Sequence, residues 1–140
     1  MKKKLTRLII ITLVLVPIVF FVLKQPGHDL DFLEKNPVFF VMWSQQEHDS
    51  VLTRPIAERI HSLVLKSIPS NESMSKFIED EIKLRFYNAD SVQLGEIRVV
   101  LMRNHHHLVL INDQEYTNTQ LIRYLEKDLQ LKLTYYPIWD

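Results

Sequence analysis

The chain has no cysteine and almost no glycine, two residues on which many recognisable functional sites depend. None of its 140 residues is cysteine, which excludes a disulfide, a thiolate nucleophile and a cysteine-ligated zinc site. Its only glycines are Gly27 and Gly95, too few for a glycine-rich loop around a phosphate group. The sequence therefore predicts neither a nucleotide-binding loop nor cysteine-dependent catalysis, and it contains no internal repeat.

Charge is balanced over the whole chain but not along it. Seventeen basic residues face 17 acidic residues, for a formal net charge of +0. Residues 1–24 hold five basic residues and no acidic one, which leaves 12 basic against 17 acidic residues, a net charge of −5, in residues 25–140. A basic nucleic-acid-binding domain is excluded by this distribution.

Residues 8–24 are predicted to form a transmembrane helix. Between Arg7 and Lys24 every residue except Thr12 and Pro17 is apolar. These 16 residues would span roughly 24 Å as a helix, and the flanking basic side chains can extend to the two interfaces. No small-residue cleavage site follows, which favours an uncleaved anchor over the alternative, a cleaved secretory signal.

The charges around this segment predict its orientation. Four basic residues precede it, whereas Asp29, Asp31 and Glu34 follow it, so the positive-inside rule places residues 1–7 in the cytoplasm. We expect an inner-membrane, single-pass protein whose C-terminal domain is periplasmic or extracellular. Residues 25–37, which are polar and turn-prone, are expected to form a short tether.

Residues 38–140 are predicted to form one α+β domain, with helices packed on a mainly antiparallel sheet in a ferredoxin-like or POTRA-like order. The β-branched and aromatic run Val38–Trp43 predicts a central strand buried on both faces. Thr53 is expected to cap a helix that ends before Pro69. The apolar face of this helix comprises Ile56, Ile60, Leu63 and Val64.

Residues 73–87 fit two periods. Apolar residues recur at helical spacing from 73 to 82, whereas residues 82–87 alternate between apolar and polar side chains. We favour a helix from Ser73 to Glu81 followed by a strand, with one helix to Tyr87 as the alternative.

The C-terminal third is expected to begin with a hairpin of residues 97–102 and 107–111. Thr117 and Gln120 have the spacing of a capping box, which predicts a helix that buries Leu121, Leu125 and Leu129. Residues 131–136 are predicted to form the final strand.

His105 and His107 are candidate metal ligands. Alternation along a strand would place both imidazoles on one face, and neutral imidazole binds zinc, copper or nickel. A third ligand would have to come from another segment, for example from His48, Glu47, Asp49 or His61. The competing interpretation is a solvated hairpin tip whose polar side chains cover a turn.

Two further groups suggest other functions. His48 beside Asp49 could serve as the base of a small membrane-tethered hydrolase, although an exposed turn explains the same residues. Tyr136 and Trp139 are candidate partner-binding residues if they are exposed, and core residues if they are not. A final strand at the sheet edge could also add a strand from a partner.

The segment from His107 to Asp140, which contains LVLINDQEYTNTQLIRYLEKDLQLKLTYY, resembles the ExbD/TolR family of biopolymer-transport proteins. The resemblance covers about a quarter of the chain and implies a strand, turn, short strand, helix and strand. It also implies a cytoplasmic N-terminus, one span and a periplasmic α+β domain. Residues 8–23 contain no ionisable side chain, so the family's intramembrane aspartate is missing and a proton-driven role is not predicted.

These observations predict a non-enzymatic, single-pass membrane protein whose outward domain is a structural or accessory part of a cell-envelope complex. The expected partners are the lipid bilayer and other envelope proteins, with homo-oligomerisation left open and no nucleic acid or cofactor. The alternatives are a metal-binding or pH-responsive module that uses His105 and His107, and the hydrolase.

Overall fold

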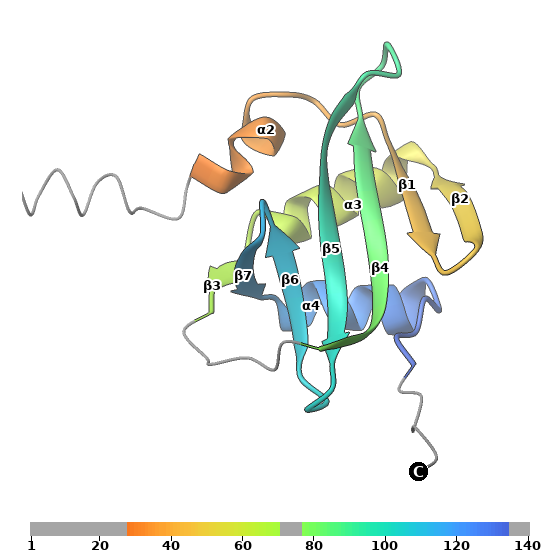
Figure 1. The fold of residues 1–140 in the computed structure, drawn as a ribbon. Coiled ribbons are helices and arrows are strands. Elements are labelled where there is room, and N and C mark those ends of the chain that lie inside the picture. The colour runs from red at the N-terminus through yellow and green to blue at the C-terminus, as the bar shows by residue number, and fades with distance from the viewer. Residues whose placement is uncertain (1–27, 71–76, 135–140) are drawn as a thin grey trace, which may run out of the picture.

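The computed structural model describes residues 28–70 and 77–134, which form an α+β domain around a seven-stranded antiparallel sheet (Figure 1). The strand order is β2-β1-β4-β5-β6-β7-β3, and every neighbouring pair is antiparallel. The strands are β1 (Phe40–Gln45), β2 (His48–Leu52), β3 (Ile68–Pro69), β4 (Ile78–Tyr87), β5 (Gln93–Met102), β6 (His107–Ile111) and β7 (Gln114–Thr117).

The described helices all pack on one face of this sheet, which we call the covered face; the opposite one is the open face. In Figure 1, α3 and α4 lie behind the strands. The helices are η1 (His28–Leu30), α2 (Asp31–Glu34), α3 (Arg54–Val64) and α4 (Thr119–Arg123), which continues as a π-helical turn, η2 (Tyr124–Asp128). Each contributes to one core cluster, through Leu30, Leu33, Ile60, Leu121 and Leu125 respectively.

Alternation along the strands builds this core. On β4, Ile82, Leu84 and Phe86 are fully buried on the covered face, whereas the residues between them lie on the open face. The predicted α+β class with helices on an antiparallel sheet is therefore confirmed. The order of elements differs from the ferredoxin-like or POTRA-like order, because a β1–β2 hairpin precedes α3 and the strands β4 to β7 follow one another directly.

The segment before β1 is built into the domain. Leu30 and Leu33 are buried, and His61 Nε2 lies 2.9 Å from the Leu33 carbonyl oxygen. The Phe32 ring lies against Gly95, where an added Cβ would come within 2.5 Å of the ring. Residues 28–34 of the expected tether are thus helical and packed; residues 25–27 lie outside the described residues.

A hydrogen bond fastens the same segment to β7. The Tyr116 hydroxyl donates to Asp29 Oδ2 at 2.7 Å, and Asn112 Nδ2 donates to the Asp29 carbonyl oxygen at 3.4 Å. Burial raises the pKa of Tyr116 well above its ordinary value, and the bond to Asp29 and the charge of that carboxylate raise it further.

The structure corrects the interpretation of Val38–Trp43. The strand is found at Phe40–Gln45, second from the edge, and only Val41 in it is buried. Burial on both faces was wrong because Phe40 and Met42 lie on the open face, which no described helix covers.

Residues 78–81 are strand, so both helical interpretations of residues 73–87 are wrong over the described part. β4 pairs with β5 from Ile78 to Tyr87, with register irregularities near each end. Long-range pairing to a ten-residue partner strand outweighs the local helical spacing. The predicted strand at residues 82–87 is confirmed; residues 73–76 lie outside the described residues.

Other predicted elements hold with local corrections. The helix at α3 and the β5–β6 hairpin are confirmed. Thr53 is at the N-cap position of α3 but its side chain makes no capping hydrogen bond, and the helix ends at Val64, before Pro69. The cap of α4 is Asn118 and not Thr117, because Asn118 Oδ1 accepts a hydrogen bond from Leu121 N at 2.9 Å. Residues 131–134 form no strand.

The expected membrane segment cannot be compared with the structure. Residues 8–24 lie outside the described residues. Within residues 28–70 and 77–134, none of the helices has the length and apolar character needed to cross a bilayer.

Candidate binding face

The open face is the candidate functional surface. Alternation brings charged side chains from two neighbouring strands together there, with Arg85 opposite Glu96 and Lys83 opposite Arg98. Met42 and Ser44 of β1 continue the same face beside Arg85 and Lys83. In the described part of the chain, no helix covers these side chains.

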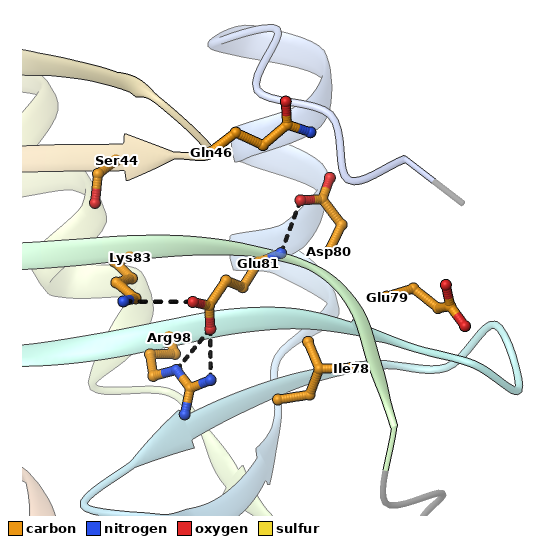
Figure 2. A pocket seen from close by; sticks show the side chains of 8 residues that line it. All are labelled: Ser44, Gln46, Ile78, Glu79, Asp80, Glu81, Lys83 and Arg98. Carbon is orange, nitrogen blue, oxygen red and sulfur yellow. Dashed lines mark hydrogen bonds and ion pairs between the residues drawn. The ribbon is translucent and has the colours of Figure 1, made fainter. Parts of the chain in front are cut away.

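Glu81 organises the charges in this region. Its Oε2 accepts a hydrogen bond from Arg98 Nε at 2.7 Å, and its Oε1 lies 3.4 Å from Lys83 Nζ. Figure 2 shows the Glu81 carboxylate between these two cations. All three side chains are about a third exposed or more, so each pair contributes about 1 kcal/mol or less to stability. The pairs can therefore rearrange at little cost when a charged partner approaches.

Arg85 is less completely paired. Its guanidinium lies 3.9 Å from Asp49 Oδ2, a distance too long for a hydrogen bond. Its Nε is buried without a hydrogen-bond partner, and it is the one such side-chain atom within residues 28–70 and 77–134. The open face thus carries a cation whose hydrogen-bonding capacity is not fully used.

A hollow of about 400 Å³ lies beside the Glu81 cluster, where β1 and β4 meet. Its lining is mostly polar and comprises Ser44, Gln46, Ile78, Glu79, Asp80, Glu81, Lys83 and Arg98. Figure 2 shows these side chains, which come from β1 and the turn after it, from β4 and from β5. No histidine lines the hollow, and it holds both charge signs, which suits recognition of a polar segment.

Asp80, at the rim of this hollow, has a structural task. The residue is only 7% exposed, and its Oδ2 accepts hydrogen bonds from Gln45 Nε2 and from Thr134 N, each at 2.9 Å. Gln45 Nε2 also donates to the Lys132 carbonyl oxygen at 2.8 Å. Asp80 therefore fixes the segment after η2 against the sheet.

Apolar side chains of β5 and β6 occupy the part of the open face next to the charged residues. Val100, Met102 and Leu108 form a second buried cluster, with Leu110 packed against it. Next to them Ile78 pairs with Met102, and Phe77 is 63% exposed with the Arg103 guanidinium 5.6 Å from its ring centre. An aromatic ring with an arginine over it is a frequent element of protein interfaces.

The two candidate metal ligands lie in different elements. His105 lies in the β5–β6 turn with φ 65°, where its backbone N donates to the Met102 carbonyl oxygen at 2.8 Å. His107 begins β6 and places Nε2 3.4 Å from Glu126 Oε1, on the covered face. Within residues 28–70 and 77–134, no group of three or more potential ligands is placed to hold a metal ion. Metal binding at His105 and His107 stays a prediction.

The proposed third ligands and the hydrolase residues lie elsewhere. His48 and Asp49 are neighbours on β2, so their side chains point to opposite faces of the sheet. Asp49 lies on the open face opposite Ser44, away from His48. His61 is on α3, where it contacts the Leu33 carbonyl oxygen. These residues do not converge on one point.

The candidate partner residues Tyr136 and Trp139 lie outside the described residues. The charged open face was not identified from the sequence as a site. The available signal was the alternation of Lys83, Arg85 and Tyr87 with apolar residues, which indicated a strand but not that its polar side stays uncovered.

Comparison with known proteins gives no further guide to function, so the proposal below rests on the geometry of the open face. No family model, no curated protein and no solved structure matches this chain.

Proposed function

We propose that this chain is a single-pass membrane protein whose outward α+β domain binds other proteins of the cell envelope through its open face. The observation that carries the proposal is the mixed-charge surface of Lys83, Arg85, Glu96 and Arg98, on a sheet face that no described helix covers. Partly exposed charged residues such as these add little to stability, whereas the apolar side chains of the covered face, and Val100, Met102 and Leu108 on the open face, are buried.

The proposed anchor is the apolar segment of residues 8–24. Three residues, 25–27, separate it from η1, and an extended chain of this length reaches at most about 10 Å. Because η1 and α2 pack into the core, this distance also limits how far the domain rises from the bilayer. A partner would therefore meet the domain close to the membrane surface.

Photo-crosslinking of the full chain in native membranes tests this proposal. A photoreactive amino acid replaces Lys83 or Arg85 on the open face, and Glu58, an exposed residue of α3, serves as the matched control position. We expect discrete adducts with one or a few membrane or envelope proteins from the open-face positions and not from Glu58. Recovery of lipids and random neighbours alone, or identical adducts from all positions, would contradict the proposal.

A charge-reversed variant sharpens the same experiment. Arg98→Glu replaces a cation of the open face with a second carboxylate beside Glu81. This change disrupts the charge pattern of the face and should reduce adduct formation at Lys83. Arg59→Glu, an exposed position on α3, is the matched control and should leave the adducts unchanged.

Alkaline extraction of the same membranes tests the proposed anchor at residues 8–24, since an integral membrane protein stays in the membrane pellet.

The second candidate function is a metal-binding or pH-responsive module that uses His105 and His107. The observation in its favour is the approach of His107 Nε2 to Glu126 Oε1 at 3.4 Å, which places an imidazole and a carboxylate near one another. Titration of the full chain with zinc or copper would raise its thermal stability if these residues bind metal. Unchanged stability and spectra would end this alternative.

A further inference from the structure

The two edges of the sheet differ in how well they are protected. At one edge β3 has two residues and contains Pro69, which carries no backbone N–H. At the other edge β2 has five residues and no proline. Short length and proline are common devices that prevent edge strands from pairing with other chains. β2 uses neither device, and among residues 28–70 and 77–134 no strand pairs with its outer side.

The register of the β1–β2 hairpin identifies the backbone groups on that outer side. The turn consists of Gln46 and Glu47, so the closing pair Gln45 and His48 exchanges both hydrogen bonds. Hydrogen-bonded pairs then alternate with non-bonded pairs along the hairpin. Asp49 and Val51 fall in the non-bonded pairs, and their N–H and C=O groups consequently point away from β1.

The side chains beside these groups define what a paired strand must present. Asp49 and Val51 both lie on the open face, where their exposures are 60% for the Asp49 side chain and 56% for Val51. Asp49 approaches Arg85 only to 3.9 Å, so its carboxylate can accept a closer cation. A complementary strand has a basic residue opposite Asp49 and an apolar residue opposite Val51, two positions apart on one face. The net charge of −5 over residues 25–140 favours the same kind of partner.

We infer that β2 accepts an added strand from a partner protein, whose extended segment carries lysine or arginine two positions from a β-branched or other apolar residue. This inference rests on the proposed protein-binding function and names the chemistry of the partner. A second copy of this chain fits less well, because β2 has the sequence HDSVL and offers no lysine or arginine to Asp49.

Backbone substitution in the full chain tests the added strand. A photoreactive amino acid at Ser50, an exposed edge position, reports the partner in native membranes. Val51→Pro removes an outward N–H while leaving the pairing with β1 intact, and it should reduce adduct yield roughly tenfold. Val51→Thr keeps the N–H and the branched shape, and it should leave the yield unchanged.

Two further variants guard against a folding artefact. Asp49→Lys keeps the backbone but reverses the charge, and we expect a loss of roughly threefold or more in adduct yield. Thermal unfolding of each variant shows whether the domain is intact. Equal yields in Val51→Pro and Val51→Thr, or in Asp49→Lys and the native chain, would overturn the inference.

The identity of the adduct separates the remaining outcomes. Mass spectrometry of the crosslinked peptide should place the Ser50 adduct on an extended segment of another protein with the basic and apolar pattern. An adduct with a second copy, or with residues 135–140 of the same chain, would overturn the inference. If the edge variants have no effect while adducts at Lys83 persist, the added strand is wrong and the proposed function stands. Absence of protein adducts from both Ser50 and Lys83 in the otherwise native chain contradicts the function itself.

Discussion

Leu84 and Lys83 are neighbours on β4, yet they lie in different surroundings. Leu84 is 0% exposed beneath the helices, whereas the Lys83 side chain on the open face is 43% exposed. The covered face is an apolar core with contributions from every described helix. The open face holds ion pairs that contribute little to stability. The open face also contains the small buried cluster of Val100, Met102 and Leu108. The comparison indicates that folding depends mainly on the covered face, whereas the charged part of the open face is available for recognition.

The largest expected effect comes from removing a covered-face side chain. Leu84→Ala leaves a cavity in the core and should lower the free energy of unfolding by about 2–5 kcal/mol. Urea unfolding followed by tryptophan fluorescence, to which Trp43 opposite Leu84 contributes, measures the change. Lys83→Ala on the same strand is the control, and an equal loss in both variants would break the distinction between the faces.

The next effect concerns the contact between α2 and the covered face. Gly95→Ala would place a methyl group within 2.5 Å of the Phe32 ring and should cost about 1–3 kcal/mol of unfolding free energy. Phe32→Ala removes the obstructing ring, so Gly95→Ala should cost less in that background. A double-mutant cycle in urea measures this coupling, and additive costs would show that the ring shifts freely.

A smaller effect is expected at Tyr116, with a defined pH dependence. Tyr116→Phe loses the hydrogen bond to Asp29 and should lower the free energy of unfolding by about 1 kcal/mol at neutral pH. The raised pKa of Tyr116 stabilises the folded protein fully below about pH 10, and this contribution is lost as pH rises from there through the folded-state pKa. Phenylalanine does not ionise.

The stability difference between the native chain and Tyr116→Phe should therefore narrow above about pH 10. Thermal unfolding of both proteins between neutral and alkaline pH measures it. A difference that stays constant or widens would show that the Tyr116 hydroxyl is not held in its protonated form by the fold.

The smallest effect on stability is expected on the open face. Arg98→Ala breaks the pair with Glu81 but should change the free energy of unfolding by about 1 kcal/mol or less, since both side chains are partly exposed. The same substitution should clearly reduce the yield of crosslinked adducts from Lys83 while the free energy of unfolding stays nearly unchanged. A variant that unfolds much more easily while keeping its crosslinks would reverse the roles assigned to the two faces.

The sequence predicts the covered face well because local patterns and final contacts agree there. The alternation from Ile82 to Phe86 indicates a strand with one buried side, and the structure has it. The Asn112–Asp113 turn between β6 and β7 has positive φ at both residues, as a tight hairpin requires. The helix at α3 also follows directly from its apolar spacing.

The edges of the domain were harder to predict because non-local contacts decide them. β2 begins with His48 and Asp49, which an exposed turn also explains. It is a strand because the Gln46–Glu47 turn pairs it with β1, with Gln46 at φ 55° where glycine is usual. Residues 131–134 alternate as a strand would, but the Thr134 N–H bonds to the Asp80 carboxylate and not to a neighbouring strand. Neither partner is apparent from local spacing.

The burial of Leu30 and Leu33 has a mechanical consequence. Pulling the first described turns out of the domain would expose both leucines to water, so a mechanical load applied at this end of the domain acts directly on its core packing. If residues 8–24 are held in a bilayer, any load carried by that anchor enters the domain through a segment of the core.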